Sequence, residues 1–503
     1  MKALFLLNVV LWLPFLVSAQ HNSDIDYHCV ENQQLQIDRI LENKQALKNG
    51  IAVPREEINV PIKFHLVADS DGLSRVDVND VLEQLCTLNM EFADTDFRFY
   101  IDNGFNLIDS DAVFNTPTQG VAVAEMLRAK RDEGPEAINI FLTESARETD
   151  VGVILGFYAN VNDWIVILES VVGTNNKALS HELGHYFSLA HPHFGWDRQP
   201  WDQAIHGNPV LITRTDGVRV ELVDGSNCDE AGDFICDTPP DYNFGFGWSR
   251  QCPDFNLDVM DRNLDVIDPL QPNFMSYFFG CDQITFTPGQ NEMMLADYMS
   301  SRREHIRTGF NPITTEIPNT LELISPENNT TTKFFDGVEL TWTTVENASQ
   351  YLVVLRSGLD EIIEIVEGTS VFITDLLPDE IYTWSVTPFN DGYTCAGKET
   401  NILRTNNITT NTEDPDFAET IRVQPNPVNI GDAVTLHIET NEALEATLSI
   451  FSIEGKAIWS EKSSIGLGKN NIKLQTNEFQ SGVYMLSLST SKGTINRKLI
   501  ISN

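Results

Sequence analysis

The sequence predicts an α/β (α+β) domain followed by two all-β sandwich domains. Three observations predict this order. The chain has 503 residues, which is too long for one hydrophobic core and suggests several domains. Strands and amphipathic helices alternate up to about residue 312. After that point helical periodicity disappears, and short strands separated by turn residues take its place.

The first domain is expected at residues 56–312. A polar pro-segment with a helix that ends at Asn49-Gly50 is expected before it, at residues 20–55. A first strand begins near Asn59, and an amphipathic helix follows at 77–93. Further strands are expected at 97–102, 137–142, 151–158 and 164–168, before a helix that carries two histidines.

The second domain is expected at residues 313–408, before a Thr/Asn/Asp-rich linker at 409–419. Alternating apolar residues predict strands at 338–342, 351–355, 371–373 and 382–386, a spacing typical of a β-sandwich. The order Trp342, then Leu377-Pro378, then Tyr382-Thr383-Trp384 resembles a fibronectin type III domain.

The last segment, residues 420–503, is also rich in β structure. Its motifs are Pro425-Asn426-Pro427, Ile453-Glu454-Gly455-Lys456, Gly482-Val483-Tyr484 and Arg497-Lys498-Leu499-Ile500-Ile501. Their order resembles the C-terminal sorting domain of type IX secretion substrates in Gram-negative bacteria. The resemblance implies export through the periplasm by the type IX secretion machinery, to a secreted or surface-attached state. A plain β-sandwich with no role in export is the alternative.

The N-terminus also predicts export. Lys2 precedes an apolar run at residues 4–17, and small residues at 17–19 fit a signal-peptidase site. A membrane anchor is the alternative, but Pro14 and the short run argue against it, because a spanning helix needs ~20 apolar residues. We therefore predict a signal peptide at residues 1–19 and no transmembrane segment in the mature chain.

Charge excludes one class of partner. The net charge is −40, from 73 acidic and 33 basic residues. Nucleic-acid binding requires a basic surface, so no nucleic-acid partner is expected. Most of the acidic side chains are expected to be solvated, and some are suited to divalent cations.

The segment His181-Glu182-Leu183-Gly184-His185 predicts a metal site. Residues four apart share one helix face, so His181 and His185 can bind the same ion. His191 is the third candidate, because no glutamate that could serve instead occurs at residues 195–220. Three protein ligands and a water are typical of catalytic zinc, and Glu182 is placed to take a proton from that water.

The spacing resembles that of metzincin zinc peptidases, with Ser188 in the position of the family's glycine. That glycine takes a left-handed conformation, which costs another residue roughly 1–2 kcal/mol. The segment 273–277 resembles the family's Met-turn, which implies Met275 beneath the metal and Tyr277 as a stabiliser of the oxyanion. A core methionine beside a buried tyrosine is the alternative. The nearby His193 and His206 are expected to be surface or packing residues.

The chain has seven cysteines, at 29, 86, 228, 236, 252, 281 and 395, so at least one has no partner within the chain. Four of them, Cys228, Cys236, Cys252 and Cys281, allow three pairings, and the sequence does not choose among these.

Residues 228–239, with Cys281 and the segment 286–290, resemble the pappalysin or cytophagalysin (ulilysin-like) branch of metzincins. The resemblance spans about residues 25–310. It implies structural Ca²⁺, with Asp229, Asp233, Asp237 and Thr238 as candidate ligands, and a polar loop held by disulfides is the alternative. It also implies Cys29 as a zinc ligand in a latent form, and a Cys29–Cys86 disulfide is the alternative.

The resemblance implies a secreted zinc endopeptidase, made as a latent zymogen, with protein or peptide substrates. An extended substrate is expected to add to a sheet edge near residues 151–158. A non-catalytic cell-surface adhesion protein on a protease-like scaffold is the alternative from another class. Substrate preference is not predicted.

Overall fold

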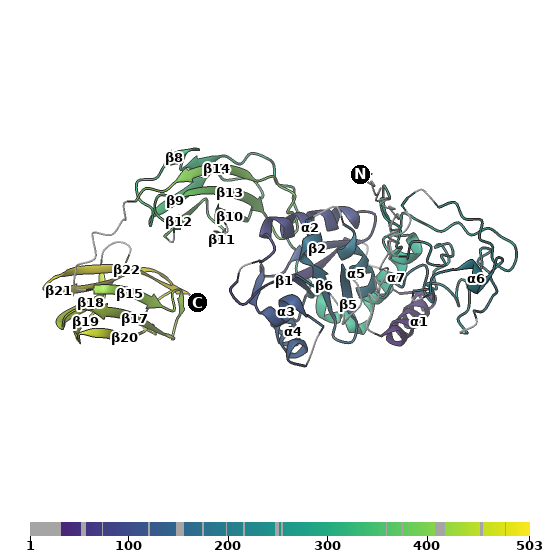
Figure 1. Ribbon diagram of the computed structural model, residues 1–503, viewed down its shortest axis with the longest axis horizontal. Coiled ribbons are helices and arrows are strands. Elements are labelled where there is room, and N and C mark those ends of the chain that lie inside the picture. The colour runs from purple at the N-terminus through teal and green to yellow at the C-terminus, as the bar shows by residue number, and fades with distance from the viewer. Residues whose placement is uncertain are drawn as a thin grey trace, which may run out of the picture.

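Figure 1 shows the computed structural model of the chain. The structure describes residues 32–51, 57–72, 74–118, 121–146, 155–173, 176–197, 199–214, 217–246, 251–252, 255–358, 360–374, 376–407, 418–452, 456–477 and 479–502. The expected signal peptide at 1–19, Cys29, and residues 151–154 of one expected strand lie outside this set.

The first domain is built on a six-stranded sheet in the order β2-β1-β4-β6-β5, with β3 also paired to β1. Its strands are β1 (Ile58–Ala68), β2 (Phe97–Ile101), β3 (Asn106–Asp109), β4 (Ile138–Thr143), β5 (Gly156–Ala159) and β6 (Trp164–Leu168). All neighbours run parallel except β5, which lies antiparallel to β6 at the edge. Four of these strands match the ranges expected from alternation, whereas β3 was not predicted.

The helices of this domain are α1 (Gln33–Asn49), α2 (Val78–Glu91), α3 (Asp111–Asn115), α4 (Val121–Glu133), α5 (Ala178–Tyr186), α6 (Gln203–His206) and α7 (Pro288–Met299). Helices α2, α3 and α5 contact the strands of the sheet. The prediction that the first helix ends at Asn49-Gly50 is confirmed, since Gly50 takes a left-handed conformation at φ 78°. Helix α1 packs beside α7 (Figure 1). Residues 218–223 form no strand, and one isolated bridge joins Thr213 to Arg219.

The second domain is a β-sandwich, as predicted. One sheet has the order β11-β10-β13-β14-β8 and the other β12-β9-β7. The strands are β7 (Leu323–Ser325), β8 (Thr330–Thr331), β9 (Val338–Trp342), β10 (Gln350–Ser357), β11 (Asp360–Val366), β12 (Ser370–Ile373), β13 (Ile381–Phe389) and β14 (Glu399–Arg404). Trp342 and Trp384 are buried between the sheets, and the Leu377 amide donates to the Tyr382 hydroxyl at 2.9 Å. This arrangement is that of a fibronectin-like sandwich.

The sandwich is tied to the first domain through α2 (Figure 1). Cys86 on α2 forms a disulfide with Cys395, 309 residues away. Leu352, Val354 and Phe389 of the sandwich belong to the same buried apolar cluster as the first domain's sheet and helices. The two domains therefore form one packed unit, and the alternative Cys29–Cys86 disulfide is wrong.

We expect loss of the Cys86–Cys395 disulfide to destabilise this unit strongly. A link between residues 309 apart restricts the unfolded chain more than a short link does, and it stabilises the folded state by on the order of 4 kcal/mol. Cys86→Ser/Cys395→Ser should lower Tm by roughly 5–10 °C in calorimetry. The matched control, Cys228→Ser/Cys236→Ser, opens a link that spans only 8 residues and should lower Tm less. Equal shifts in the two variants would contradict this expectation.

The C-terminal domain has its own apolar core between a β15-β17-β20 sheet and a β16-β22-β21-β18-β19 sheet. Its strands are β15 (Ala418–Gln424), β16 (Val428–Asn429), β17 (Ala433–Thr440), β18 (Leu444–Ser452), β19 (Ala457–Ile465), β20 (Gly468–Gln475), β21 (Gly482–Thr490) and β22 (Gly493–Ser502). In the described part of the chain, no helix is both long and apolar enough to cross a membrane.

Candidate metal centre

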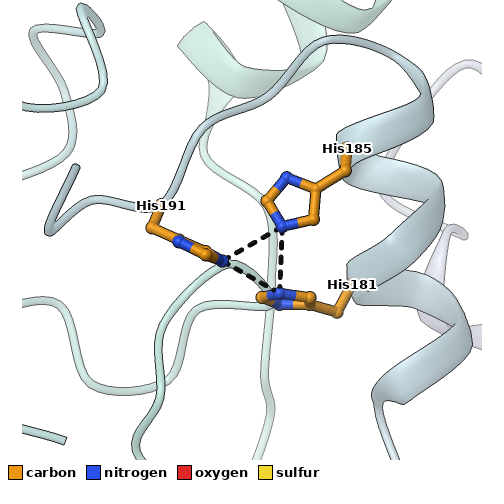
Figure 2. A group of neighbouring side chains, drawn as sticks. All are labelled: His181, His185 and His191. Atoms are coloured by element: carbon orange, nitrogen blue, oxygen red, sulfur yellow. Dashed lines mark hydrogen bonds between the residues drawn. The ribbon is translucent and has the colours of Figure 1, made fainter. Parts of the chain in front are cut away.

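Helix α5 and the turn that follows it bring three histidines together (Figure 2). His181 and His185 lie one helical turn apart on α5. The helix is capped at Phe187, and the amides of Ser188 and Leu189 donate to the carbonyls of His185 and Gly184, each at 2.9 Å. These two bonds form a Schellman turn, which reverses the chain and returns His191 to the helix.

Ser188 occupies the left-handed position of this turn, with φ 68°. This matches the conformation expected there, although the residue is not glycine. Its hydroxyl donates to Asp297 Oδ1 at 2.6 Å. Burial opposes ionisation of Asp297, but the guanidinium groups of Arg303 and Arg302 lower its pKa to about 2. The carboxylate therefore stays charged at neutral pH and fixes the serine side chain, which offsets part of the cost of the turn.

The three Nε2 atoms face one another. They are separated by 3.2 Å (His181–His185), 3.0 Å (His185–His191) and 3.2 Å (His181–His191), as the dashed lines in Figure 2 show. Nitrogen ligands about 2.0–2.1 Å from a tetrahedral zinc ion would lie about 3.3–3.4 Å apart. The observed triangle is therefore close to the size that a zinc ion requires.

The other ring nitrogens determine which tautomer is present. His181 Nδ1 donates to the Phe274 carbonyl at 2.8 Å, and His185 Nδ1 to the Leu189 carbonyl at 2.8 Å. His191 Nδ1 donates to Asp197 Oδ1 at 2.6 Å. Because carbonyl and carboxylate oxygens only accept, the ring protons must be on Nδ1, and each Nε2 presents a lone pair.

Burial also keeps two of these rings neutral. It lowers the pKa of His185 to about 4, and together with the neighbouring His185 and His191 it lowers the pKa of His181 well below the usual range. Three lone pairs at this separation repel one another unless a cation lies between them. The donor set therefore fits a zinc ion, and its remaining coordination position would face away from the three rings.

The segment 273–278 lies against these rings. Besides the Phe274 carbonyl, it contributes Met275, which is fully buried. A β-carbon at Gly184 would lie only 2.4 Å from Met275 Sδ, so the methionine side chain packs directly against the helix at this glycine. The Tyr277 ring centre lies 4.8 Å from that of His191. The structure thus brings Met275 and Tyr277 to the histidines, as expected.

Glu182 follows His181 on α5 and is only 2% exposed. Helix α5, which carries Glu182, contacts the edge strand β5. A carboxylate next to the first histidine in this buried setting can accept a proton from a molecule at the metal position.

Two further residues, Asp197 and His193, contact the site although neither was predicted to belong to it. Asp197 orients His191 and also accepts from the Gly195 amide at 3.0 Å, and its position six residues after a histidine ligand is the only sequence signal for it. His193 was expected to be a surface or packing residue. It is fully buried, with its ring centre 4.4 Å from Tyr277 and 4.6 Å from His191, so it packs behind the site. His206 lies farther out, against Trp196.

The four candidate calcium ligands do not converge. Asp229 is exposed and pairs with Lys44 at 2.6 Å. Asp233 accepts from the Thr238 hydroxyl at 2.8 and 2.9 Å, and Asp237 accepts from Thr287 and the Gly289 amide at the start of α7. Among the residues that the structure describes, carboxylates alone form no group of three with metal-ligand spacing. This loop fits the alternative of a polar loop held by disulfides, Cys228–Cys236 and Cys252–Cys281.

Comparison with known proteins assigns only the C-terminal domain. Residues 422–502 match the family described as secretion system C-terminal sorting domain. No curated protein matches the chain. The chain is similar to the FN1-FN3 domains of chicken CNTN1, at 11% identity and a TM-score of 0.15, over 35% of this chain and 69% of that one. It is also similar to dimeric latent PorU from Porphyromonas gingivalis, at 14% identity and a TM-score of 0.15, over 38% of this chain and 20% of that one.

At TM-scores of 0.15, these two similarities do not identify the fold or the function of the first domain. The family match is different, since it covers nearly the whole C-terminal domain and agrees with its independent core. This domain is a type IX secretion sorting domain, and the chain is exported by that machinery to a secreted or surface-attached state.

Proposed function

We propose that the chain is a secreted zinc endopeptidase of the metzincin type. One observation carries the proposal: three imidazoles, each with Nδ1 hydrogen-bonded to an oxygen acceptor, direct their Nε2 atoms at a common point, with mutual separations of at most 3.2 Å. The Schellman turn, the buried Met275 and the nearby Tyr277 support the same reading. A zinc assay combined with casein digestion tests it, because a non-catalytic adhesion protein would leave casein intact.

A zinc ion bound here would polarise the scissile carbonyl and lower the pKa of a bound water. Glu182 would accept the proton of the attacking water and pass it to the leaving amine. Tyr277 donates its hydroxyl proton in a hydrogen bond to the developing oxyanion. Asp197 keeps His191 in the tautomer that leaves Nε2 free of a proton.

Strand β5 offers the docking edge for a substrate, because within the described sheet it pairs only with β6. An extended peptide that added to its open side would pass next to α5 and Glu182. Such pairing requires several main-chain bonds, which favours an internal peptide bond over a chain end.

We expect the orienting carboxylate to matter for zinc affinity. Asp197→Ala removes the acceptor of His191 Nδ1, so the ring can rotate or change tautomer, and zinc should bind about 10–100-fold more weakly. Competition with a chromogenic chelator measures this. Asp202→Ala, which removes an exposed aspartate that caps α6, is the matched control and should bind zinc like the wild type. Unchanged affinity in Asp197→Ala would remove this residue from the site.

Latency is part of the proposal. Six of the seven cysteines form the three disulfides, which leaves Cys29, outside the described residues, as the seventh. A thiolate is a good zinc ligand and would displace the catalytic water. Helix α1, within the expected pro-segment, is docked on the first domain, where Gln36 donates to the Leu189 carbonyl at 2.7 Å.

We expect Cys29→Ala precursor to cleave casein without processing, because no thiolate would then block the metal. Wild-type precursor should be latent until proteolysis near Arg55, and the two are compared in the same digest before and after limited proteolysis. A Cys29→Ala precursor as latent as the wild type would show that the cysteine does not restrain the enzyme.

A further inference from the structure

Lys177 is a buried cation beside the candidate centre. It directly precedes α5 and is 9% exposed. Its Nζ donates to three main-chain carbonyls, those of Asn273 at 3.2 Å, Ser276 at 2.7 Å and Phe278 at 3.1 Å. An ammonium group has three protons, so these contacts use its full donor capacity.

All three carbonyls belong to the loop that carries Tyr277, and two of them, Ser276 and Phe278, flank this tyrosine. The other side of the same segment is also fixed. A β-carbon at Gly245 would lie 2.6 Å from the Tyr277 carbonyl carbon and 2.7 Å from the Phe278 nitrogen. The Tyr277 main chain is therefore held between the Lys177 ammonium and the backbone of Gly245.

Placing a cation here is unfavourable by itself. Burial lowers the pKa of Lys177 to about 7, and only the charge of Glu91 opposes this shift. An apolar side chain would avoid the desolvation, but it would leave three inward-facing carbonyls without a donor. The lysine is thus required by the loop conformation and not by helix α5, whose own turns do not use its side chain.

We propose that Lys177 is the positioning residue for Tyr277, and that it fixes the distance between this tyrosine and the helix that carries His181 and Glu182. The inference rests on the proposed peptidase function. The three hydrogen bonds of the Lys177 ammonium all go to main-chain carbonyls of this loop, so the lysine acts on the reaction through the loop.

The test compares zinc content, kcat and KM in the mature protein, after the pro-segment has been removed. Lys177→Met should keep one zinc per chain and a KM close to wild type, while kcat falls by about 10–100-fold, because a small displacement of a catalytic group costs that much. Lys177→Arg, which keeps several donors, should restore part of kcat. Lys63→Met is the matched control, since Lys63 also donates to two main-chain carbonyls, of Asp102 and Asn103, outside the site.

A double-mutant cycle with Tyr277→Phe identifies the route of the effect. If Lys177 acts through Tyr277, the double variant should be no slower than Tyr277→Phe alone. Gly245→Ala pushes the same segment from the opposite side and should give the same loss of kcat, so it replaces Lys177→Met if that variant does not fold. Wild-type kcat in a zinc-loaded variant, or multiplicative losses in the cycle, would overturn the proposal.

The proposed function can fail separately. If the wild type binds zinc but cleaves no protein, the peptidase proposal is wrong, and Lys177 is then judged by hydrogen exchange of residues 273–278. Faster exchange there in Lys177→Met, with α5 unchanged, supports the positioning role, and unchanged exchange refutes it.

Discussion

Glu182→Gln is expected to lower kcat for protein hydrolysis by about 10²–10⁴-fold while the zinc content stays at that of the wild type. Glutamine has nearly the same shape but cannot accept a proton at neutral pH. The metal should be retained because the three Nε2 atoms and their partners do not involve this side chain. A quenched fluorescent protein substrate gives kcat, and elemental analysis of the purified variant gives zinc.

Glu221→Gln is the matched control, a second buried glutamate in the same domain. Burial, and then the nearby Asp233 charge, raise the pKa of Glu221 to about 10, so its carboxyl is protonated at neutral pH and an amide replaces it without loss of charge. Activity close to wild type is expected in this variant. A zinc-loaded Glu182→Gln enzyme as active as Glu221→Gln would mean that Glu182 is not the proton acceptor.

The sequence predicted features that depend on neighbouring residues and missed those that depend on partners far along the chain. The end of α1 was predictable because Gly50 acts locally on the backbone. The three histidines were predictable because their spacing alone places them on one helix and one turn. The left-handed conformation of Ser188 was implied by the family resemblance, whereas its stabilising partner Asp297, 109 residues away, was not.

Long-range partners account for most of what was missed. Periodicity cannot pair Cys86 with Cys395, and it cannot show that Lys177 meets three carbonyls about a hundred residues later. The calcium site stays a prediction, and the contacts of its candidate ligands were also not predictable from the sequence. Asp229 and Asp237 lie in the expected loop, but a lysine and the start of α7 take up their oxygens.

These contacts also change where the proposed catalytic unit should end. A boundary near residue 312 would be natural from the change in periodicity. It would, however, remove Cys395 and the apolar residues Leu352, Val354 and Phe389, which pack into the first domain's core. Removing them would expose that core, so we take the end of the sandwich, near Asn407, as the smallest unit that folds.

Deletion of residues 418–503 is expected to abolish release from the native host while the enzyme keeps its activity. The sorting domain has its own apolar cluster and shares no member with the core of the first domain, so its loss should not disturb the three histidines. The truncated enzyme should accumulate inside the cell envelope, and its kcat after purification should lie within about twofold of the full-length value, as expected for a distant, independent change. Fractionation followed by a casein digest measures both.

A second truncation at residue 312 is the control and should yield little soluble protein, because it cuts into the shared core. Normal release of the first truncation would mean that these residues are dispensable for export. Loss of its activity would mean that the sorting domain also supports the fold of the peptidase unit.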